Sequence, residues 1–268
     1  MASWGTPPGL SCWAVMSRLI IFGATGSLGS HVLHLALAAG HQVTVFVRTP
    51  SRLPLEAQNQ VSVHQGDLSI LAPVDIAQLI SGHDALINCA GLVSEGQTFV
   101  DLIDRLVTAV ESLPTAAQPV CWFLAGAALL DIGPSGRKGV ELPRVKSTYW
   151  PHRVNFERIS RSGLDWRLLC PGPMVEEPAL GLNRLRIALD TLPVQVPAFA
   201  RALPGPLFLP IFAYLIPKMI VPYADAAALM LANLNRGDTL ARHRVGLALP
   251  LGMRGKKSQW AAKPRNAA

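Results

Sequence analysis

Three glycines spaced three residues apart, Gly23, Gly26 and Gly29, follow directly on the apolar run Leu19-Ile-Ile-Phe22 and precede a helical pattern. In a strand-turn-helix of this kind, the first glycine permits a sharp turn, the second lets backbone N–H groups approach a pyrophosphate, and the third lets the helix pack closely on the strand. The positive end of the helix then favours the phosphates. The spacing predicts a dinucleotide-binding turn, with the cofactor held by Gly23, Thr25, Gly26, Ser27, Leu28 and Gly29.

A cation follows the second apolar run, where the choice between two nicotinamide cofactors is usually made. Arg48 comes directly after Val43-Thr-Val-Phe-Val47 and lies nineteen residues after Gly29. A protein specific for NAD usually places an acid here for the ribose 2′-OH, whereas an arginine can pair with a 2′-phosphate. Arg52 either adds a second guanidinium or lies in solvent, and Arg48 itself could be an ordinary surface arginine. The sequence favours NADP(H) over NAD(H).

Small and polar residues end the later predicted strands, at the sheet edge where such a cofactor would lie. Asp67 is expected either to hydrogen-bond the adenine or to form an ordinary Asx turn, and the leucine after it to pack on the adenine. Cysteines end two of these strands without a basic partner nearby in the sequence, so they are expected to be small packing residues. The further cofactor-binding candidates are Asp67, Leu68, Cys89, Ala90, Gly91, Ala125, Gly126 and Pro171.

Short β-rich runs alternate with helical patterns up to residue 170, which is typical of βαβ units that build a parallel sheet. Strands are expected near 18–22, 43–47, 61–65, 85–89, 120–125 and 166–170. Helices are expected near 27–39, 74–81, 98–112 and 152–162. The predicted fold class is α/β, a Rossmann-type doubly wound parallel sheet with strand order 3-2-1-4-5-6 and a seventh strand near 244–249.

Prolines are frequent between residues 173 and 222 and interrupt any regular strand pattern. We expect this segment to form a small, mostly helical substrate cover without regular sheet. Within this cover, Tyr214-Leu-Ile-Pro-Lys218 matches a Tyr-x-x-x-Lys motif by coincidence, because its proline disturbs the helical spacing of the pair. The apolar run 207–221 is broken by prolines and a lysine, whereas a membrane-spanning helix needs about 20 apolar residues. A buried or substrate-facing helix is favoured here over shallow, peripheral membrane contact. Asp225 is expected to cap the helix that follows the cover.

Composition places the chain among globular proteins with a sizeable core, since half of its 268 residues are hydrophobic. The net charge of +7 comes partly from a basic tail, for which a solvated face is favoured over contact with nucleic acid or an anionic membrane. The four cysteines lie far apart and the histidines do not cluster, so neither a metal site nor a disulfide framework is expected. This cysteine usage favours the cytoplasm.

The predicted organisation is one domain with two flanking segments. Residues 1–16 are expected to be a disordered extension, because no basic residue precedes an apolar core as in a signal peptide. Residues 17–253 form the NAD(P)-binding domain, including the cover at 173–222, and residues 254–268 form a basic, disordered tail. We expect a monomer or a homodimer.

As an ordered set, these motifs resemble the atypical short-chain dehydrogenase/reductases, and most closely their NAD(P)H-binding group of flavin/biliverdin reductase-like and NmrA-like proteins. The resemblance rests on Gly23-Ala-Thr-Gly-Ser-Leu-Gly29, Val47-Arg-Thr-Pro-Ser-Arg-Leu53, Gly66-Asp-Leu68, Asn88-Cys-Ala-Gly91 and Ser162-Gly-Leu-Asp-Trp-Arg-Leu-Leu-Cys-Pro-Gly172. It implies a Rossmann fold and NADP(H). It leaves the reaction open, because the group includes reductases, isomerases and redox sensors.

The resemblance also shows where the chain departs from the classical members. These use a serine after strand five and a Tyr-x-x-x-Lys helix, whose tyrosine donates a proton. Here strand five ends in Ala125-Gly126, which resembles the flavin-reductase-like form with backbone facing the nicotinamide, and the helix carries Tyr149 and Arg153. Tyr149 or His152 is the candidate proton donor, Arg153 could hold a ribose hydroxyl, and His152 could equally face solvent at a helix start.

These observations predict an NADPH-dependent oxidoreductase that reduces a small apolar acceptor, such as a quinone, flavin, enone or carbonyl. The alternative is a non-catalytic NADP(H) sensor, or an assembly protein, that docks a partner through residues 207–222. Loss of the classical serine and lysine favours the sensor, whereas the apolar cover favours an apolar substrate.

Overall fold

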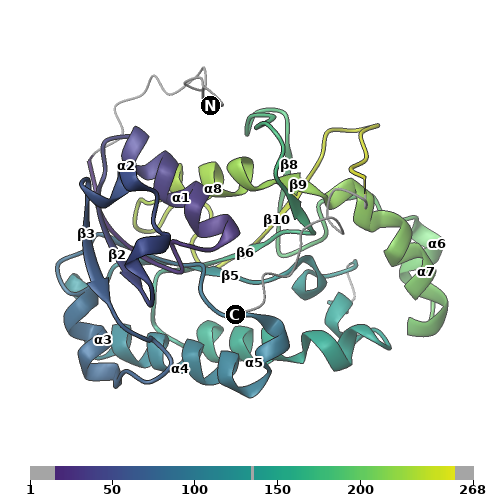
Figure 1. The fold of residues 1–268 in the computed structure, drawn as a ribbon. Coiled ribbons are helices and arrows are strands. Elements are labelled where there is room, and N and C mark those ends of the chain that lie inside the picture. Colours follow the sequence, from purple (N-terminus) through teal and green to yellow (C-terminus); the bar gives the residue numbers. More distant parts are fainter. Residues whose placement is uncertain (1–15, 134–135, 257–268) are drawn as a thin grey trace.

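The computed structural model describes residues 16–133 and 136–256 (Figure 1). The predicted extension therefore lies outside the described residues, apart from Met16, and so does most of the predicted tail, from residue 257 onward. Two residues at the start of that tail are in place: Arg254 donates to the Tyr214 carbonyl at 3.3 Å, and the Gly255 N–H donates to the Pro217 carbonyl at 2.7 Å.

A central sheet organises the described chain, with strand order β3-β2-β1-β4-β5-β6-β10-β8. Its strands are β1 (Arg18–Phe22), β2 (Gln42–Val47), β3 (Val61–Gln65), β4 (Ala85–Asn88), β5 (Val120–Leu124), β6 (Trp166–Cys170), β8 (Arg186–Leu189) and β10 (Arg244–Ala248). All neighbours pair in parallel except β8, which runs antiparallel to β10. The predicted order and the seventh strand are confirmed.

Helices cover both faces of this sheet (Figure 1). The α-helices of the described residues are α1 (Ser27–Ala38), α2 (Leu55–Gln58), α3 (Pro73–Ile80), α4 (Gln97–Glu111), α5 (Val145–Ser160), α6 (Ala198–Arg201), α7 (Gly205–Leu215) and α8 (Tyr223–Leu231). On one face α1 packs against α8, and on the other α3 packs against α4 and α4 against α5. The arrangement is that of a doubly wound α/β protein.

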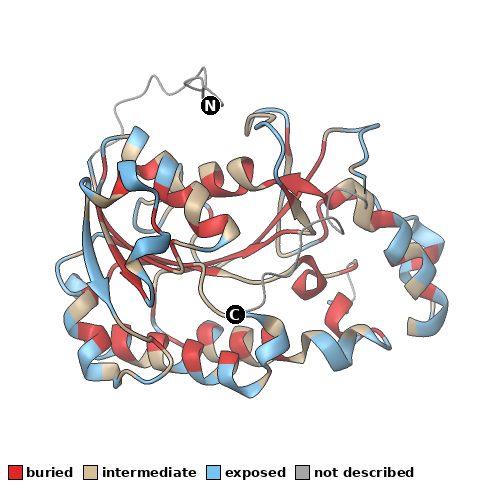
Figure 2. Ribbon diagram, in the orientation of Figure 1, coloured by how far each residue is buried: buried red, intermediate tan, exposed pale blue. Residues whose placement is uncertain are grey.

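Strand β1 shows why the sheet needs helices on both of its faces. In β1, Leu19 and Ile21 join the apolar core on the α1 side, while Ile20 and Phe22 join the core on the α4 side. All four are fully buried. Because successive strand residues point to opposite faces, an uninterrupted apolar strand requires apolar cover on both sides, as Figure 2 shows by the buried faces of the flanking helices.

Three sequence expectations are wrong in detail. Helix α5 begins at Val145 rather than near residue 152, so Pro151 lies inside the helix rather than in its first turn. The proline-rich segment is not free of sheet, because β8 adds to the main sheet and β7 (Met174–Val175) pairs with β9 (Val221–Pro222). Asp225 does not cap its own helix: its carboxylate accepts the backbone N–H groups of Leu180 and Gly181, both at 2.8 Å.

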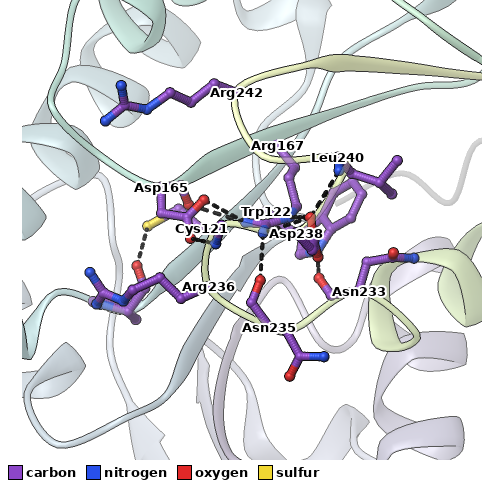
Figure 3. A network of polar contacts seen from close by, with 12 residues as sticks. Cys121, Trp122, Asp165, Arg167, Asn233, Asn235, Arg236, Asp238, Leu240 and Arg242 are labelled. Carbon is purple, nitrogen blue, oxygen red and sulfur yellow. Dashed lines mark hydrogen bonds and ion pairs between the residues drawn. The ribbon is translucent and has the colours of Figure 1, made fainter.

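A buried arginine ties the sheet to the loop after α8, at the edge where the parallel strands begin (Figure 3). Arg167 on β6 is completely buried and forms ion pairs with Asp165 at 3.0 Å and Asp238 at 2.9 Å. It also donates to the Asn235 carbonyl at 2.7 Å. Next to it, the Trp122 indole N–H donates to the Asn233 carbonyl at 3.0 Å. The network is structural, since it lies opposite the edge where cofactors bind in such folds.

We expect the Arg167→Ala substitution to lower the free energy of unfolding by about 3–5 kcal/mol, because it leaves two carboxylates partly buried without their cation. Denaturant titration of both variants tests this, with Arg161→Ala as the control, since Arg161 is exposed and should change stability by less than about 0.5 kcal/mol. Equal stability of the two variants would contradict a structural role for the network.

Candidate functional site

Backbone contacts at the glycine turn leave no room for side chains. Gly23 has a φ of +78°, and a Cβ there would lie 2.7 Å from the amide nitrogen of Ala90. A Cβ on Gly29 would lie 2.1 Å from the carbonyl oxygen of Gly23. The Gly26 N–H closes the turn by donating to the same carbonyl at 3.0 Å. The turn thus brings the start of α1 against the ends of β1 and β4, which only glycine allows.

The N-terminus of α1 can accept an anion. Gly26, the residue before the helix, is exposed, no side chain caps the helix, and its first turn holds no acid. Thr25 and Ser27 are half-buried beside it, whereas the Leu28 side chain is buried in the core, so this leucine can offer a ligand only its backbone. The positive helix end and the glycine cradle fit the pyrophosphate of a dinucleotide.

Two exposed arginines stand where β2 ends. Arg48 follows β2, and Arg52 lies in a short 3₁₀ helix, Pro50–Arg52. Both side chains are exposed, and neither guanidinium forms an ion pair with any described residue. Two cations without a protein partner at this point are available to a phosphate.

Asp67 forms the Asx turn that the sequence left open. Its carboxylate accepts the hydroxyl of Ser69 at 2.7 Å and the backbone N–H of Ser69 at 2.9 Å. These hydrogen bonds, together with the nearby charge of Arg48, hold the pKa of Asp67 below its ordinary value. Leu68 is buried in the core. Asp67 therefore stays ionised beside Arg48, with one oxygen committed to the turn.

At the end of β4, the backbone of residues 88–91 passes close to neighbouring groups. Asn88 is buried and hydrogen-bonds both the N–H and the carbonyl of Ala90, each at 3.2 Å. Gly91 has a φ of +96°, and a Cβ there would lie 2.4 Å from the ring of Phe99. Burial raises the pKa of the Cys89 thiol to about 12, so the thiol is protonated at neutral pH and serves packing.

The residues that follow β5 and β6 meet helix α5. The Ala125 N–H donates to the Leu169 carbonyl and the Ala127 N–H to the Pro171 carbonyl, both at 2.8 Å, so the two loops run together. A Cβ on Gly126 would lie 3.5 Å from Nε2 of His152. The structure thus brings together Gly126, Pro171 and His152, which are far apart in the sequence.

Tyr149 and His152 share a face of α5. Their rings stack at 6.1 Å between centroids, and Phe99 meets the imidazole edge-on at 5.7 Å. His152 is buried, which lowers its pKa to about 4. The imidazole is therefore neutral at pH 7, and of the two alternatives for His152 the solvent-facing histidine at a helix start is wrong. Tyr149 is half-buried and carries the only hydroxyl of the pair.

The Arg153 guanidinium is engaged by another side chain of α5. It forms an exposed ion pair with Glu157, one helical turn further on, at 2.9 Å. A buried arginine instead supports the site: Arg244 donates to the Leu129 carbonyl at 2.8 Å, pairs with Asp131, and lies 4.9 Å from the ring centroid of Phe156. Arg244 thereby connects the loop after Gly126 to helix α5.

Sequence reasoning missed two features near the site. His31, in the first turns of α1, pairs with Glu176 at 2.8 Å and stacks on Tyr223 at 5.7 Å. This links α1 to the start of the cover segment, and no local pattern connects residues 145 positions apart. Asn155, also on the buried face of α5, has no hydrogen-bond partner for either side-chain atom among the described residues. The only signal for Asn155 in the sequence was a polar residue at helical spacing from the apolar Pro151 and Ile159.

The glycine cradle, the open helix N-terminus and the strand order define a nucleotide-binding Rossmann protein. The NAD(P)H-binding family model matches residues 23–193, so the chain belongs to this family and binds a nicotinamide cofactor. No described helix is long and apolar enough to cross a membrane.

Solved structures share the fold. A Rossmann-fold NAD(P)-binding family protein from Shigella flexneri is 18% identical, with a TM-score of 0.59 over 90% of this chain and 98% of that one. An oxidoreductase from Lactococcus lactis is 19% identical, with a TM-score of 0.62 over 91% and 95%. An anaerobilin reductase from Escherichia coli O157:H7 is 18% identical, with a TM-score of 0.58 over 87% and 98%.

The buried imidazole predicts a pH dependence of stability. The unfolded chain protonates His152 below about pH 6.5, whereas the folded protein does so only near pH 4, so this contribution to stability is lost as the pH falls between these values. For His152→Phe, we expect the fall in unfolding free energy from about pH 7 to about pH 5 to be smaller than in the wild type by about 2 kcal/mol.

Denaturant titrations at the two pH values measure this difference. His64→Gln is the control, because His64 is exposed and should leave the pH dependence unchanged. A parallel loss of stability in the wild type and in His152→Phe would mean that His152 is already charged in the folded protein.

Proposed function

We propose that the protein is an NADPH-dependent oxidoreductase that reduces a small apolar acceptor, with flavins and quinones favoured over carbonyls and enones. The observation that carries the proposal is the meeting of Gly126, Pro171 and His152 beyond the ends of β5 and β6, where the parallel strands end as β1 does at the dinucleotide turn. In this arrangement, backbone rather than a serine hydroxyl borders the place where a nicotinamide would lie. The bound nicotinamide supplies a hydride to the acceptor.

The chemistry of helix α5 supports an acceptor that needs little acid catalysis. His152 is neutral at pH 7 and buried, so it cannot supply a proton as an imidazolium. The Arg153 guanidinium is paired with Glu157. A flavin or quinone that accepts a hydride takes its remaining proton from water, whereas a carbonyl benefits from a positioned acid. Tyr149 would then orient the acceptor through its hydroxyl.

NADPH is the cofactor that the arginines favour. Arg48 and Arg52 are exposed cations at the end of β2, and Arg48 lies beside the ionised Asp67. A 2′-phosphate can form a charge-assisted hydrogen bond with the Arg48 guanidinium, whereas a neutral 2′-hydroxyl cannot pair with its positive charge. The fold likeness to an anaerobilin reductase agrees with a reductase but leaves the acceptor to experiment.

The cofactor preference gives a direct prediction. We expect Arg48→Ala to weaken NADPH binding by about 10- to 100-fold, because a charge-assisted hydrogen bond to the 2′-phosphate is lost, and to leave NADH binding unchanged. Titration of each nucleotide by calorimetry measures both affinities. Arg161→Ala, an exposed arginine at the end of α5, is the control. Equal weakening of both cofactors would overturn the assignment of Arg48 to the 2′-phosphate.

Turnover is tested with a panel of flavins, quinones and aldehydes, by following the loss of reduced nicotinamide. We expect flavin or quinone reduction, and we expect Tyr149→Phe to retain it within about threefold, since no obligatory acid is removed. If carbonyls are the true substrates, the same variant should lose about 10²- to 10⁴-fold in rate.

The second candidate is a sensor of NADP(H) that docks a partner through residues 207–222. The classical serine and lysine are absent, and neither the neutral His152 nor Arg153, which is paired with Glu157, replaces them. This favours the sensor. Tight NADPH binding without turnover of any member of the panel would overturn the enzyme proposal and support the sensor.

A further inference from the structure

Helix α7 presents an uncharged face to solvent. Its sequence, Gly205-Pro-Leu-Phe-Leu-Pro-Ile-Phe-Ala-Tyr-Leu215, contains no charged residue. Phe208, Phe212 and Leu215 are buried in the core, while Leu207 is 61% exposed and Tyr214 is 59% exposed on the other side. An apolar helix face left in water is the kind of surface that marks an interaction site.

Other exposed apolar side chains extend this surface. Phe199 on α6 is 71% exposed, and Leu251 and Met253 are exposed on the loop after β10. That loop packs beside α7, since Arg254 donates to the Tyr214 carbonyl at 3.3 Å. The Leu249 N–H also donates to the carbonyl of Lys218, in the 3₁₀ helix Ile216–Met219 that follows α7, at 2.8 Å. Helices α6 and α7 project from one end of the sheet, away from β3 (Figure 1), and Figure 2 shows much of their outer face as exposed.

A basic hollow adjoins the helix. It has a volume of about 240 Å³ and is lined by Arg186, Lys218 and Arg254 together with Gln195, Leu251 and Met253. None of the described residues that line it is acidic. Three cations around one concavity of this size can take a phosphate group.

Tyr214 lies on the exposed side of α7 and contacts two of the cations that line the hollow. The Arg254 guanidinium lies 4.3 Å from its ring centroid, and the Lys218 ammonium lies 5.3 Å from it. Arg254 also donates to the Tyr214 carbonyl at 3.3 Å. The Tyr214 ring thus contacts two cations, on a helix that contains no charged residue. Aromatic rings in such surroundings are typical of a membrane interface.

The surrounding sequence carries only positive charge. Between Asp190 and Asp225 the chain has no acid, and its only charged residues are Arg201 and Lys218. After Asp238 it has no acid at all, while lysines and arginines recur to the end. A surface of this composition repels cations and attracts anionic lipid headgroups.

We propose that Leu207, Tyr214 and Leu251, with Lys218, Arg254 and Arg186, form a docking face for an anionic phospholipid bilayer. The aliphatic and aromatic side chains enter the interface between headgroups and acyl chains, and the hollow takes the phosphate of a headgroup. The face goes beyond the proposed oxidoreductase function and does not depend on it. Docking there would bring the protein to the place where lipid-soluble acceptors are dissolved.

Cosedimentation of the full chain with vesicles tests the proposal. We expect binding to vesicles of phosphatidylcholine with phosphatidylglycerol to exceed binding to phosphatidylcholine alone by about tenfold, and to weaken as salt is added. Leu207→Gln should weaken binding to both kinds of vesicle. Lys218→Gln with Arg254→Gln should remove the preference for the anionic vesicles.

The matched control is Val74→Gln. Val74 on α3 is also 61% exposed, at the other end of the sheet, so its substitution should leave vesicle binding unchanged. Circular dichroism of each variant checks that the fold is retained.

Four results would overturn the proposal. The first is equal binding to the neutral and the anionic vesicles. The second is unchanged vesicle binding in Leu207→Gln. The third is competition by soluble glycerol phosphate that abolishes all association with vesicles, which would identify a soluble anion site. The fourth is a dimer that Leu207→Gln dissociates, together with no binding to vesicles, which would assign the face to a second copy of the chain.

Discussion

The contact of backbone on backbone at the glycine turn is the constraint on which the rest of the structure depends. A Cβ on Gly29 would lie 2.1 Å from the carbonyl oxygen of Gly23, and a Cβ on Gly23 would meet the backbone of residues 89 and 90. These contacts fix α1 against β1 and β4 at the centre of the sheet. Because the helix end is held there without a side-chain cap or an acid, it offers its positive end to a phosphate.

The two ends of the parallel strands have different roles. Where the parallel strands begin, Arg167 binds two carboxylates and a carbonyl and connects the loop after α8 to the sheet. Where the strands end, Arg244 holds the loop after Gly126 beside α5.

Local patterns in the sequence were enough to predict the glycine turn and the arginine at the end of β2, because each depends on residues close together in the chain. The sheet order could be predicted because alternating strands and helices follow the right-handed crossover rule. Strand β8 escaped prediction, since an edge strand among prolines has no apolar alternation of its own and forms by pairing with β10. The burial of His152 depends on Phe99, and the carboxylate of Asp225 serves a loop 44 residues away. Such contacts follow from tertiary packing and have no local signature.

A crystal structure with bound NADP⁺ tests the central claim most directly. We predict that the pyrophosphate lies on the backbone amides at the start of α1, that the 2′-phosphate lies within hydrogen-bond distance of Arg48, and that the nicotinamide packs against Ala125 and Gly126. A nucleotide bound with its nicotinamide away from Gly126, or with its pyrophosphate outside the glycine turn, would contradict the account.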